Sequence, residues 1–361
     1  MATMKEIAER AGVSISSVSL VLNNRDKGRV APRTAARIRA LARKMRYHPN
    51  LLARSLQTSS TRILGFISEN VATTPYASRL ILGAQDAADE CGYALFSANV
   101  DSGRFDDAPS DNLGRVMDVF YQYGVDGFLY AKMSNCIFDP PAPADKPMVL
   151  VDCSDRGHRI PSIEPDEFLI GYDATCRLAR AGCRKIAYLG FPDPTVAQVR
   201  RRAGYRQALK DAGLPYDSAL DLKIGENSEA LKAVDALVER KSPDGFFCFN
   251  DARALHVYLA AAGRNLKIGV DISVIGVDNH RMFSQTLSPR LTTVELPHYE
   301  MGYWAVNRLV QEMEGEPIRL PQEKGWASLP DLESAPPALI HCRLIEKESL
   351  KGGRRDETPL R

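Results

Sequence analysis

The chain has 361 residues, of which 44% are apolar and 25% charged, a composition typical of a soluble protein with two or more folding units. It contains no apolar run of about 18 residues, no signal peptide and no C-x-x-C pair among its seven cysteines, so we expect a cytoplasmic protein with reduced thiols, no membrane partner, no structural metal and no cofactor. Residues 1–62 carry 13 Lys and Arg against 3 Asp and Glu (+10) and the remainder carries 34 against 42 (−8), which predicts a polyanionic partner for the N-terminal end only.

Two short helices are predicted at the N-terminal end. Thr3 and Glu6 have the spacing of a capping box, and the apolar residues that follow share one face of a helix from about residue 4 to residue 11. Gly12 ends this helix, and Ser14 is a suitable N-cap for a second one. The second helix has a stripe of apolar residues at helical spacing, formed by Val18, Val21 and Leu22.

The outer face of the second helix carries mainly small side chains. Ser16 and Leu20 lie opposite the apolar stripe, with Ser17 and Ser19 on the flanks and Ile15 in the exposed first turn. Pro32 suits the first turn of a third helix, whose inward residues are Ile38, Leu41, Ala42 and Met45. Three short helices with a Gly-containing turn between the first two predict a helix-turn-helix, whose second helix fits the major groove of DNA.

Each of these features also has an ordinary structural explanation. Serines on a helix can simply be solvated, and runs of Lys and Arg are more often solubilising surfaces than binding sites. The turn, the small-residue face and the +10 charge nevertheless occupy the same N-terminal region. This coincidence favours nucleic acid as the partner.

The stretches "TMKEIAERAGVSISSVSLVLN" and "RYHPNLLARSL" resemble the LacI family of bacterial transcriptional regulators, and the resemblance extends over nearly the whole chain. It implies that Thr3 and Ser14 cap helices and contact phosphate. The positions implied to read bases are Lys5, Ile15, Ser16 and Leu20. The positions implied to lie nearer the DNA backbone are Ser17, Ser19 and Asn23.

The chain departs from the family pattern at three places. Leu20 stands where many members carry Arg, so it can offer only an apolar contact, for example to a thymine methyl group. Ala31 stands where a capping Ser is usual, which weakens the start of the third helix by roughly 1 kcal/mol. The loop "NRDKGR" is longer than is typical, and its basic side chains Arg25, Lys27 and Arg29 are candidates for further phosphate contacts.

Residues 1–48 are therefore expected to be the DNA-binding domain, and residues 49–61 a hinge. The segment "NLLARSLQ" is too short to form a stable helix alone, so from the residues by themselves an ordinary linker is an equal alternative. The resemblance implies a hinge helix that orders on DNA and pairs with its dimer mate in the minor groove. In that arrangement Leu56 is the wedge that enters a base step, with Ala53 packed against the groove and Arg54 beside it.

Beyond residue 61, short apolar strand-like runs alternate with helical stretches, which predicts βαβ units and parallel sheets. The resemblance implies a two-lobed, periplasmic-binding-protein-like α/β domain over residues 62–345, with the chain crossing between lobes near residues 162, 291 and 324. Lobe 1 is then expected to contain about 62–162 and 291–323, and lobe 2 about 163–290 and 324–345. We expect residues 346–361 to be a disordered tail.

Polar side chains follow several of the predicted strands, where ligands of open α/β sheets bind. These are Asp152, Asn250, Asp251 and Asp278. Asp at a strand end is also a common turn former, so each one alone is ambiguous. The family resemblance makes all four effector-contacting positions, and it adds Arg201, Tyr76 and, as a weaker candidate, Tyr130. Leu296 falls where some members carry a polar ligand contact, so the identity of the effector stays open.

Together these features predict a repressor that binds a pseudo-palindromic double-stranded operator as a homodimer, with a tetramer left open, and that responds to a sugar or a related metabolite. No catalytic residues are assigned, because the sequence has no G-x-S-x-G, Walker A or G-x-G-x-x-G motif. Two alternatives stay open. One is a small-molecule-binding protein or α/β enzyme whose basic end meets nucleic acid incidentally, and the other is a DNA-binding regulator controlled by a protein co-regulator.

Overall fold

The computed structural model describes residues 2–47, 60–69, 71, 74, 77–100, 112–137, 139–140, 145–225, 227–323 and 325–352. The chain divides into two compact units, Met1–Thr61 and Arg62–Arg361. No helix within these described ranges is long and apolar enough to cross a membrane.

The first unit contains three helices, α1 (Met4–Ala11), α2 (Ile15–Leu22) and α3 (Pro32–Lys44). Thr3 closes a capping box with Glu6 at the start of α1, and Gly12 ends this helix in the left-handed conformation with φ 59°. Apolar residues from all three helices form one buried core, which includes Ile7, Val18, Val21 and Ile38. The capping signals and the apolar periodicity of the sequence thus predicted these helices closely.

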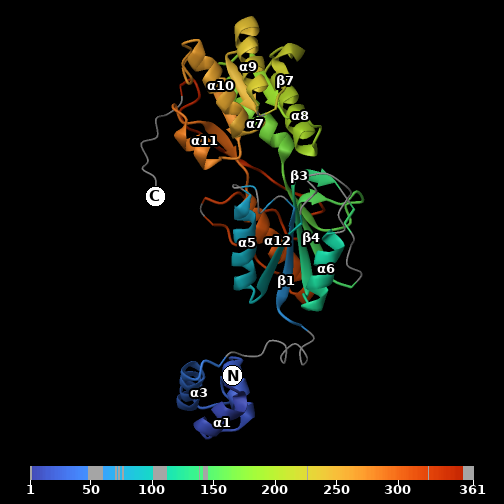
Figure 1. Ribbon diagram of the computed structural model, residues 1–361, viewed down its shortest axis with the longest axis vertical. Coiled ribbons are helices and arrows are strands. Elements are labelled where there is room, and N and C mark those ends of the chain that lie inside the picture. The colour runs from blue at the N-terminus through green and yellow to red at the C-terminus, as the bar shows by residue number, and fades with distance from the viewer. Residues whose placement is uncertain are drawn as a thin grey trace. The chain divides into compact units, whose positions relative to one another are not determined.

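In its described residues, the second unit contains two six-stranded sheets, each the centre of one lobe (Figure 1). The lobe 1 sheet has the order β11-β5-β4-β3-β1-β2, all parallel. Its strands are β1 (Ile63–Glu69), β2 (Ala94–Val100), β3 (Gly127–Ile137), β4 (Met148–Ser154), β5 (Ser162–Pro165) and β11 (Ala338–Ile340). Strands β4 and β5 are buried on both faces, as expected of strands inside a parallel sheet.

The lobe 2 sheet has the order β12-β10-β9-β8-β6-β7, and only the β10–β12 pair is antiparallel. Its strands are β6 (Ile186–Gly190), β7 (Asp221–Lys223), β8 (Gly245–Cys248), β9 (Ser273–Val277), β10 (Thr292–Glu295) and β12 (Arg343–Ile345). The two sheets together confirm the prediction of a two-lobed α/β domain built from βαβ units.

Helices cover both sheets. Those of lobe 1 are α5 (Ser78–Glu90), α6 (Asn112–Gln122) and α12 (His298–Glu314). Those of lobe 2 are α7 (Glu167–Arg180), α8 (Val196–Asp211), α9 (Ser228–Lys241), α10 (Asp251–Gly263) and α11 (Arg281–Thr286), together with the short 3₁₀ helix η1 (Ser218–Leu220). In Figure 1 the helices of lobe 2 lie in the upper part of the second unit, and those of lobe 1 lie in its lower part.

The chain crosses between the lobes three times, and two of these crossings differ from the prediction. The first follows β5, close to the expected residue 162. The second was expected near residue 291, but β10 pairs with β9 in lobe 2, so the crossing lies between Glu295 and His298. The third was expected near residue 324, but β11 pairs with β5 in lobe 1, so it lies between Ile340 and Arg343.

The segment before β11 packs against lobe 1 instead of forming a surface loop. Ala327, Leu329 and Leu332 are buried in the core of lobe 1. The indole nitrogen of Trp304 in α12 donates a hydrogen bond to the carbonyl oxygen of Pro330 at 3.0 Å. These contacts explain why residues 325–340 belong to lobe 1.

The prediction of a disordered tail from residue 346 is wrong for residues 346–352. The side chains of Ser349 and Leu350 are buried, and the Ser349 hydroxyl donates to the carbonyl oxygen of Val274 at 2.6 Å. Glu348 pairs with Arg290 at 3.1 Å. This segment continues from β12 along the edge of lobe 2, while residues 353–361 lie outside the described residues.

Paired glycines set the closest helix contacts in each lobe. In lobe 2, a Cβ on Gly171 of α7 would lie 2.0 Å from the carbonyl oxygen of Arg201, and one on Gly204 of α8 would lie 2.0 Å from that of Phe168. In lobe 1, Gly83 of α5 and Gly302 of α12 meet the facing backbone in the same way. Because no side chain fits between these backbones, α7 and α8 are held in one register.

Candidate functional site

The exposed face of α2 carries the side chains that the sequence predicted there. Ile15 in the first turn is 49% exposed. Ser16 is exposed, and Leu20, four residues later and so on the same side of the helix, is partly buried. Ser17 and Ser19 are partly buried on its flanks, and Lys5 of α1 is exposed. Small side chains on this face allow the backbone of the helix to approach a nucleic acid closely.

Hydroxyl groups organise the start of α2. The backbone N–H of Ser17 donates to the Ser14 hydroxyl at 3.2 Å, which makes Ser14 the N-cap. The same hydroxyl lies 2.8 Å from that of Ser16 and 2.9 Å from that of Ser17. At the other end of α2, the side-chain amide of Asn23 donates to the carbonyl oxygen of Ser19 at 2.9 Å. These bonds fix both ends of α2, and at its N-terminal end the free backbone N–H groups attract anions.

Basic side chains surround this helix. Arg25, Lys27 and Arg29 in the loop before α3 are exposed, and Asp26 in the same loop pairs with Arg39 of α3 at 2.8 Å. This ion pair fastens the loop to α3. No side-chain hydrogen bond caps α3 at Ala31, as its sequence predicted. Ala53, Arg54 and Leu56 of the predicted hinge lie outside the described residues.

A second site lies in the other unit, where a cavity of about 40 Å³ separates the two lobes. Its lining comes from the carboxyl ends of strands in both sheets and from α7 and α8, and comprises Met133, Asp152, Pro165, Glu167, Arg201, Phe249, Asn250, Asp278 and Leu296. The carboxyl ends of parallel strands are where open α/β sheets bind ligands. Four of the predicted effector positions, Asp152, Arg201, Asn250 and Asp278, therefore meet at one place.

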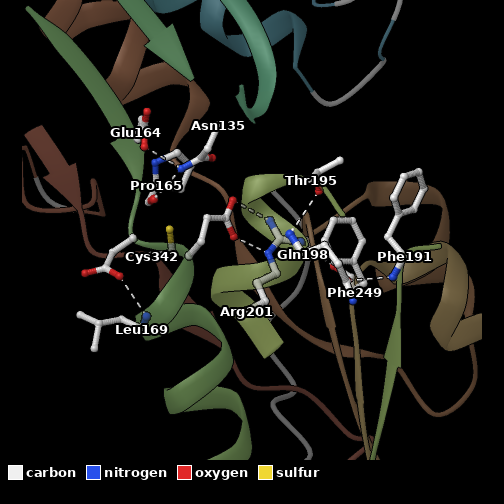
Figure 2. Close-up of polar contacts among 12 residues, drawn as sticks. Asn135, Glu164, Pro165, Leu169, Phe191, Thr195, Gln198, Arg201, Phe249 and Cys342 are labelled. Carbon is white, nitrogen blue, oxygen red and sulfur yellow. Dashed lines mark hydrogen bonds and ion pairs between the residues drawn. The ribbon is translucent and has the colours of Figure 1, made fainter. Parts of the chain in front are cut away.

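Arg201 is held rigidly at this cavity (Figure 2). Its Nη1 donates to the carbonyl oxygen of Phe249 at 2.6 Å, and its guanidinium carbon lies 4.4 Å from the centre of the Phe249 ring. Its Nη2 donates to Oε1 of Glu167 at 3.0 Å, and its Nε donates to Oε2 of the same residue. The result is a bidentate ion pair between two buried side chains.

Hydrogen bonds and an ion pair made by lobe 1 residues connect the cavity wall to lobe 2. The backbone N–H of Asn135 donates to Asp152 at 3.1 Å. The side-chain amide of Asn135 donates to Glu164 at 3.0 Å (Figure 2). Arg200 of α8 reaches the same Glu164 carboxylate at 3.1 Å. An ion pair thus connects β5 of lobe 1 with α8 of lobe 2 beside the cavity.

The backbone is strained at both aspartates of the lining. Asp152 has φ 53° and Asp278 has φ 103°, both in the region that favours glycine. Asn135 and Asn279, their neighbours, also have positive φ. Asn and Asp tolerate this conformation better than other residues, and such strain concentrates at functional sites.

The side chains of Asn250 and Asp278 have different surroundings. The side-chain oxygen of Asn250 caps α10 by accepting from the backbone N–H of Arg253 at 3.0 Å and also accepts from its Nη1 at 3.1 Å. Its amide NH₂ is then the part that can face a ligand. Burial, with Asp251 close by, raises the pKa of Asp278 well above its usual value. A hydrogen-bond donor beside Asp278 would stabilise its charged form.

Two predicted positions, Asp251 and Tyr130, do not line the cavity, and a third lies outside the described residues. Asp251 is fully buried and accepts hydrogen bonds from the Thr293 hydroxyl at 2.6 Å and the His280 backbone N–H at 2.7 Å, so it faces into lobe 2. The hydroxyl of Tyr130 donates to Glu69 at 2.8 Å within lobe 1. Tyr76 lies outside the described residues.

Glu167 and Phe249 line the cavity, although no role was predicted for either residue from the sequence. Glu167 is the first residue of α7, and Asp166 caps this helix by accepting from the backbone N–H of Leu169 at 3.0 Å. An acidic pair before a helical run is an ordinary helix start, which conceals the second role of Glu167. Its contact with Arg201 comes only from the packing of α7 on α8.

Comparison with known proteins finds a family match in each of the two units. Residues 3–50 match the family model for bacterial regulatory proteins of the lacI family, and residues 175–327 match the periplasmic binding protein-like domain. The ribose operon repressor of Escherichia coli (strain K12) is 31% identical, over 87% of this chain and 93% of that protein. The chain belongs to the LacI family.

Other proteins similar to this LacI-family chain are also transcriptional regulators by name. The HTH-type transcriptional repressor PurR of Histophilus somni (strain 2336) is 30% identical, over 87% of this chain and 92% of that protein. A solved transcriptional regulator of the LacI family from Rhizobium etli has a TM-score of 0.68 at 27% identity, and covers 80% of this chain and 99% of that one. The LacI-family chain is accordingly a DNA-binding transcriptional regulator, with its helix-turn-helix in the first unit and an effector-binding type of domain in the second.

Proposed function

We propose that this LacI-family regulator is a repressor that binds a pseudo-palindromic operator as a homodimer and is controlled by a sugar or related metabolite in the inter-lobe cavity. The observation that carries the proposal is the meeting of Asp152, Arg201, Asn250 and Asp278, from both lobes, around one cavity. Carboxylates accept hydrogen bonds from hydroxyl groups, and Arg and Asn donate to hydroxyl or ring oxygens. A ligand that bridges the lobes would change their relative closure.

The proposed DNA contacts follow the exposed face of α2. Lys5, Ile15, Ser16 and Leu20 would face base edges, while Thr3, Ser14, Ser17, Ser19 and Asn23 would contact the backbone. Ala53, Arg54 and Leu56 of the hinge would enter the minor groove. In this proposal the protein binds DNA and a ligand and catalyses no reaction. It acts in the cytoplasm, at the nucleoid.

Exposed apolar side chains on lobe 1 support a homodimer. Strand β2 is the edge strand of its sheet, and Phe96 on β2 is 37% exposed. Its ring meets that of Tyr123, which is 58% exposed, with centroids 5.7 Å apart. Leu82 on α5, which packs beside β2, is 53% exposed. A pseudo-palindrome needs two helix-turn-helix units, and a second copy of this chain would cover these side chains.

The relatives support a metabolite as the effector but do not identify it. One relative of about 30% identity is named a ribose operon repressor and another is named PurR. The leucine at position 296 lines the cavity, so one part of the ligand would meet an apolar wall.

Two measurements test the proposal. Operator sequences selected from a random DNA library should be pseudo-palindromic, and two chains should bind each one in analytical ultracentrifugation. Calorimetry of the full chain with a panel of sugars should find a ligand whose affinity falls when Asp152 or Asp278 is replaced by Ala. Selection of a single unrepeated half-site, bound by one chain, would contradict the dimeric reading.

A further inference from the structure

We infer that the effector of this cavity carries no negative charge, and that Glu167 is the residue that imposes this selectivity. The inference rests on the proposed function of the cavity as an effector site. It concerns the charge class of the ligand, which would be a hydroxyl- or amine-bearing compound without a phosphate or carboxylate group.

The argument begins with the N–H groups of Arg201. A guanidinium has five, and three of them are engaged with Glu167 and with the carbonyl oxygen of Phe249. Two N–H groups remain to donate to a neutral oxygen such as a hydroxyl. The planar fork that would clasp an anion is already occupied by the Glu167 carboxylate.

Glu167 cannot easily leave this position. It is the first residue of α7, where the helix dipole favours a carboxylate, and its side chain is only 2% exposed. The close approach of Gly171 and Gly204 to the facing backbones fixes α7 against α8. An anionic ligand would have to displace a carboxylate that the fold holds in place.

The remaining charges of the lining oppose an anion as well. The cavity wall contains the carboxylates of Asp152, Glu167 and Asp278 and one guanidinium, that of Arg201. Behind the wall, the fully buried Asp251 and Arg253 shift the pKa of Asp278 in opposite directions. The carboxylates therefore outnumber the cations around the cavity, and like charges repel a phosphate or carboxylate.

Hydrogen bonding leads to the same ligand class. Asp152 and Asp278 accept hydrogen bonds, so a ligand between them must donate. Burial raises the pKa of Asp278, so its ionised form is favoured only where a hydrogen-bond donor or a positive charge lies beside it, and an anionic ligand would disfavour that form further. Hydroxyl and amine groups meet this requirement, whereas ionised phosphates and carboxylates can only accept.

The first test identifies the charge class without knowing the ligand. The small-molecule extract of the source bacterium would be separated by ion exchange at neutral pH into anionic, neutral and cationic fractions. Each fraction would be added to the full chain, with thermal unfolding as the readout, because a ligand of the folded state raises the Tm. We expect the Tm to rise only with the neutral or the cationic fraction. A rise only with the anionic fraction would overturn the inference, and no rise with any fraction would overturn the proposed effector site itself.

The second test uses Glu167→Gln, which keeps the shape of the side chain and removes its charge. Glucose 6-phosphate and inorganic phosphate, measured by calorimetry, should bind this variant about tenfold or more tightly than the unaltered chain, because Arg201 has lost its counter-ion. Glu167→Asp retains the charge and should still exclude both probes. Adding Arg201→Gln to Glu167→Gln should abolish the acquired binding, which locates it at this cavity.

Circular dichroism and Tm would show that each variant is folded before it is titrated. Equal phosphate binding by the Gln and Asp variants, or acquired binding that survives the loss of Arg201, would contradict the role of Glu167. If Glu167→Gln fails to fold, the fractionation with the unaltered chain still decides the charge class.

Discussion

Glu167 and Arg201 form a bidentate ion pair in which both side chains are almost completely buried, at the wall of the cavity between the lobes. The pair joins the first turn of α7 to the middle of α8 within lobe 2. It positions the guanidinium against the Phe249 carbonyl oxygen and ring, where two of its N–H groups stay available to a ligand. A structural role and the proposed ligand-binding role therefore coincide in one contact.

Removing one partner of this pair should destabilise the fold strongly. Glu167→Ala leaves a buried guanidinium without its carboxylate, and we expect a loss of about 3–5 kcal/mol in the free energy of unfolding, measured by urea denaturation. Glu229→Ala provides the control, because its partner Lys232 lies on the exposed surface of α9 and both side chains are at least 69% exposed. Similar losses of unfolding free energy in the two variants would show that the buried pair stabilises the fold no more than the exposed pair does.

The contact between α7 and α8 should be intolerant of a single methyl group. A Cβ on Gly171 would lie 2.0 Å from the carbonyl oxygen of Arg201, so Gly171→Ala must push the helices apart. We expect a lower Tm and, because Arg201 moves with α8, weaker effector binding. Gly263→Ala is the matched control: nothing lies within 4 Å of its Cβ, so replacement of this last residue of α10 should leave the Tm unchanged or slightly raised. Equal behaviour of the two variants would argue against the proposed register.

Because of Asp251, the folded protein should become less stable as the pH rises. Burial raises its pKa to about 7 in the folded state, against about 3.9 in an unfolded chain. Between these values the folded protein holds a proton that the unfolded chain has released, so stability falls as pH rises, by up to about 1.4 kcal/mol per pH unit. Asp251→Asn removes this contribution, and the difference between the two unfolding free energies should change between pH 5 and pH 7. Parallel pH profiles would contradict the raised pKa.

The sequence predicted best what depends on neighbouring residues. Thr3 with Glu6 and Ser14 with Ser17 are hydrogen-bonded caps three residues apart, so their helices could be located from local spacing. The third lobe crossing could not be located in this way, because it depends on the pairing of β11 with β5, strands far apart in the sequence.

The same distinction separates the cavity residues that were predicted from those that were not. Asp152 and Asp278 follow buried strands, a pattern visible in the sequence. Asp251 follows a strand too, but Thr293 and the backbone of His280 bind its carboxylate and turn it into lobe 2. Glu167 has the appearance of an ordinary helix start, and only the α7–α8 contact brings it to Arg201.

The missing cap of α3 offers a stabilising substitution. Ala31 occupies the N-cap position with no side-chain hydrogen bond. Ala31→Ser supplies a hydroxyl that can accept from a free backbone N–H of the first turn, and we expect a gain of about 1 kcal/mol in the stability of the first unit. Hydrogen exchange of the α3 amides in the full chain would measure it. Ala36→Ser, at an exposed position inside the same helix, should give no such gain. Equal protection in the two variants would exclude capping as the cause.

Leu20 should help to set the base preference of the regulator. It lies on the same side of α2 as Ser16, partly buried, and offers only apolar contact such as that to a thymine methyl group. Leu20→Arg introduces a bidentate donor for guanine, so sites selected from a random DNA library should shift toward guanine at one position of each half-site. Non-specific binding should stay equal or strengthen slightly, because the added charge is attracted to phosphate. Arg33→Leu is a useful comparison, since it removes one exposed charge of α3 and should weaken binding across all sequences without changing the preferred bases. If Leu20→Arg selects the same sites as the unaltered chain, Leu20 does not face the bases, and the proposed register of α2 in the major groove is wrong.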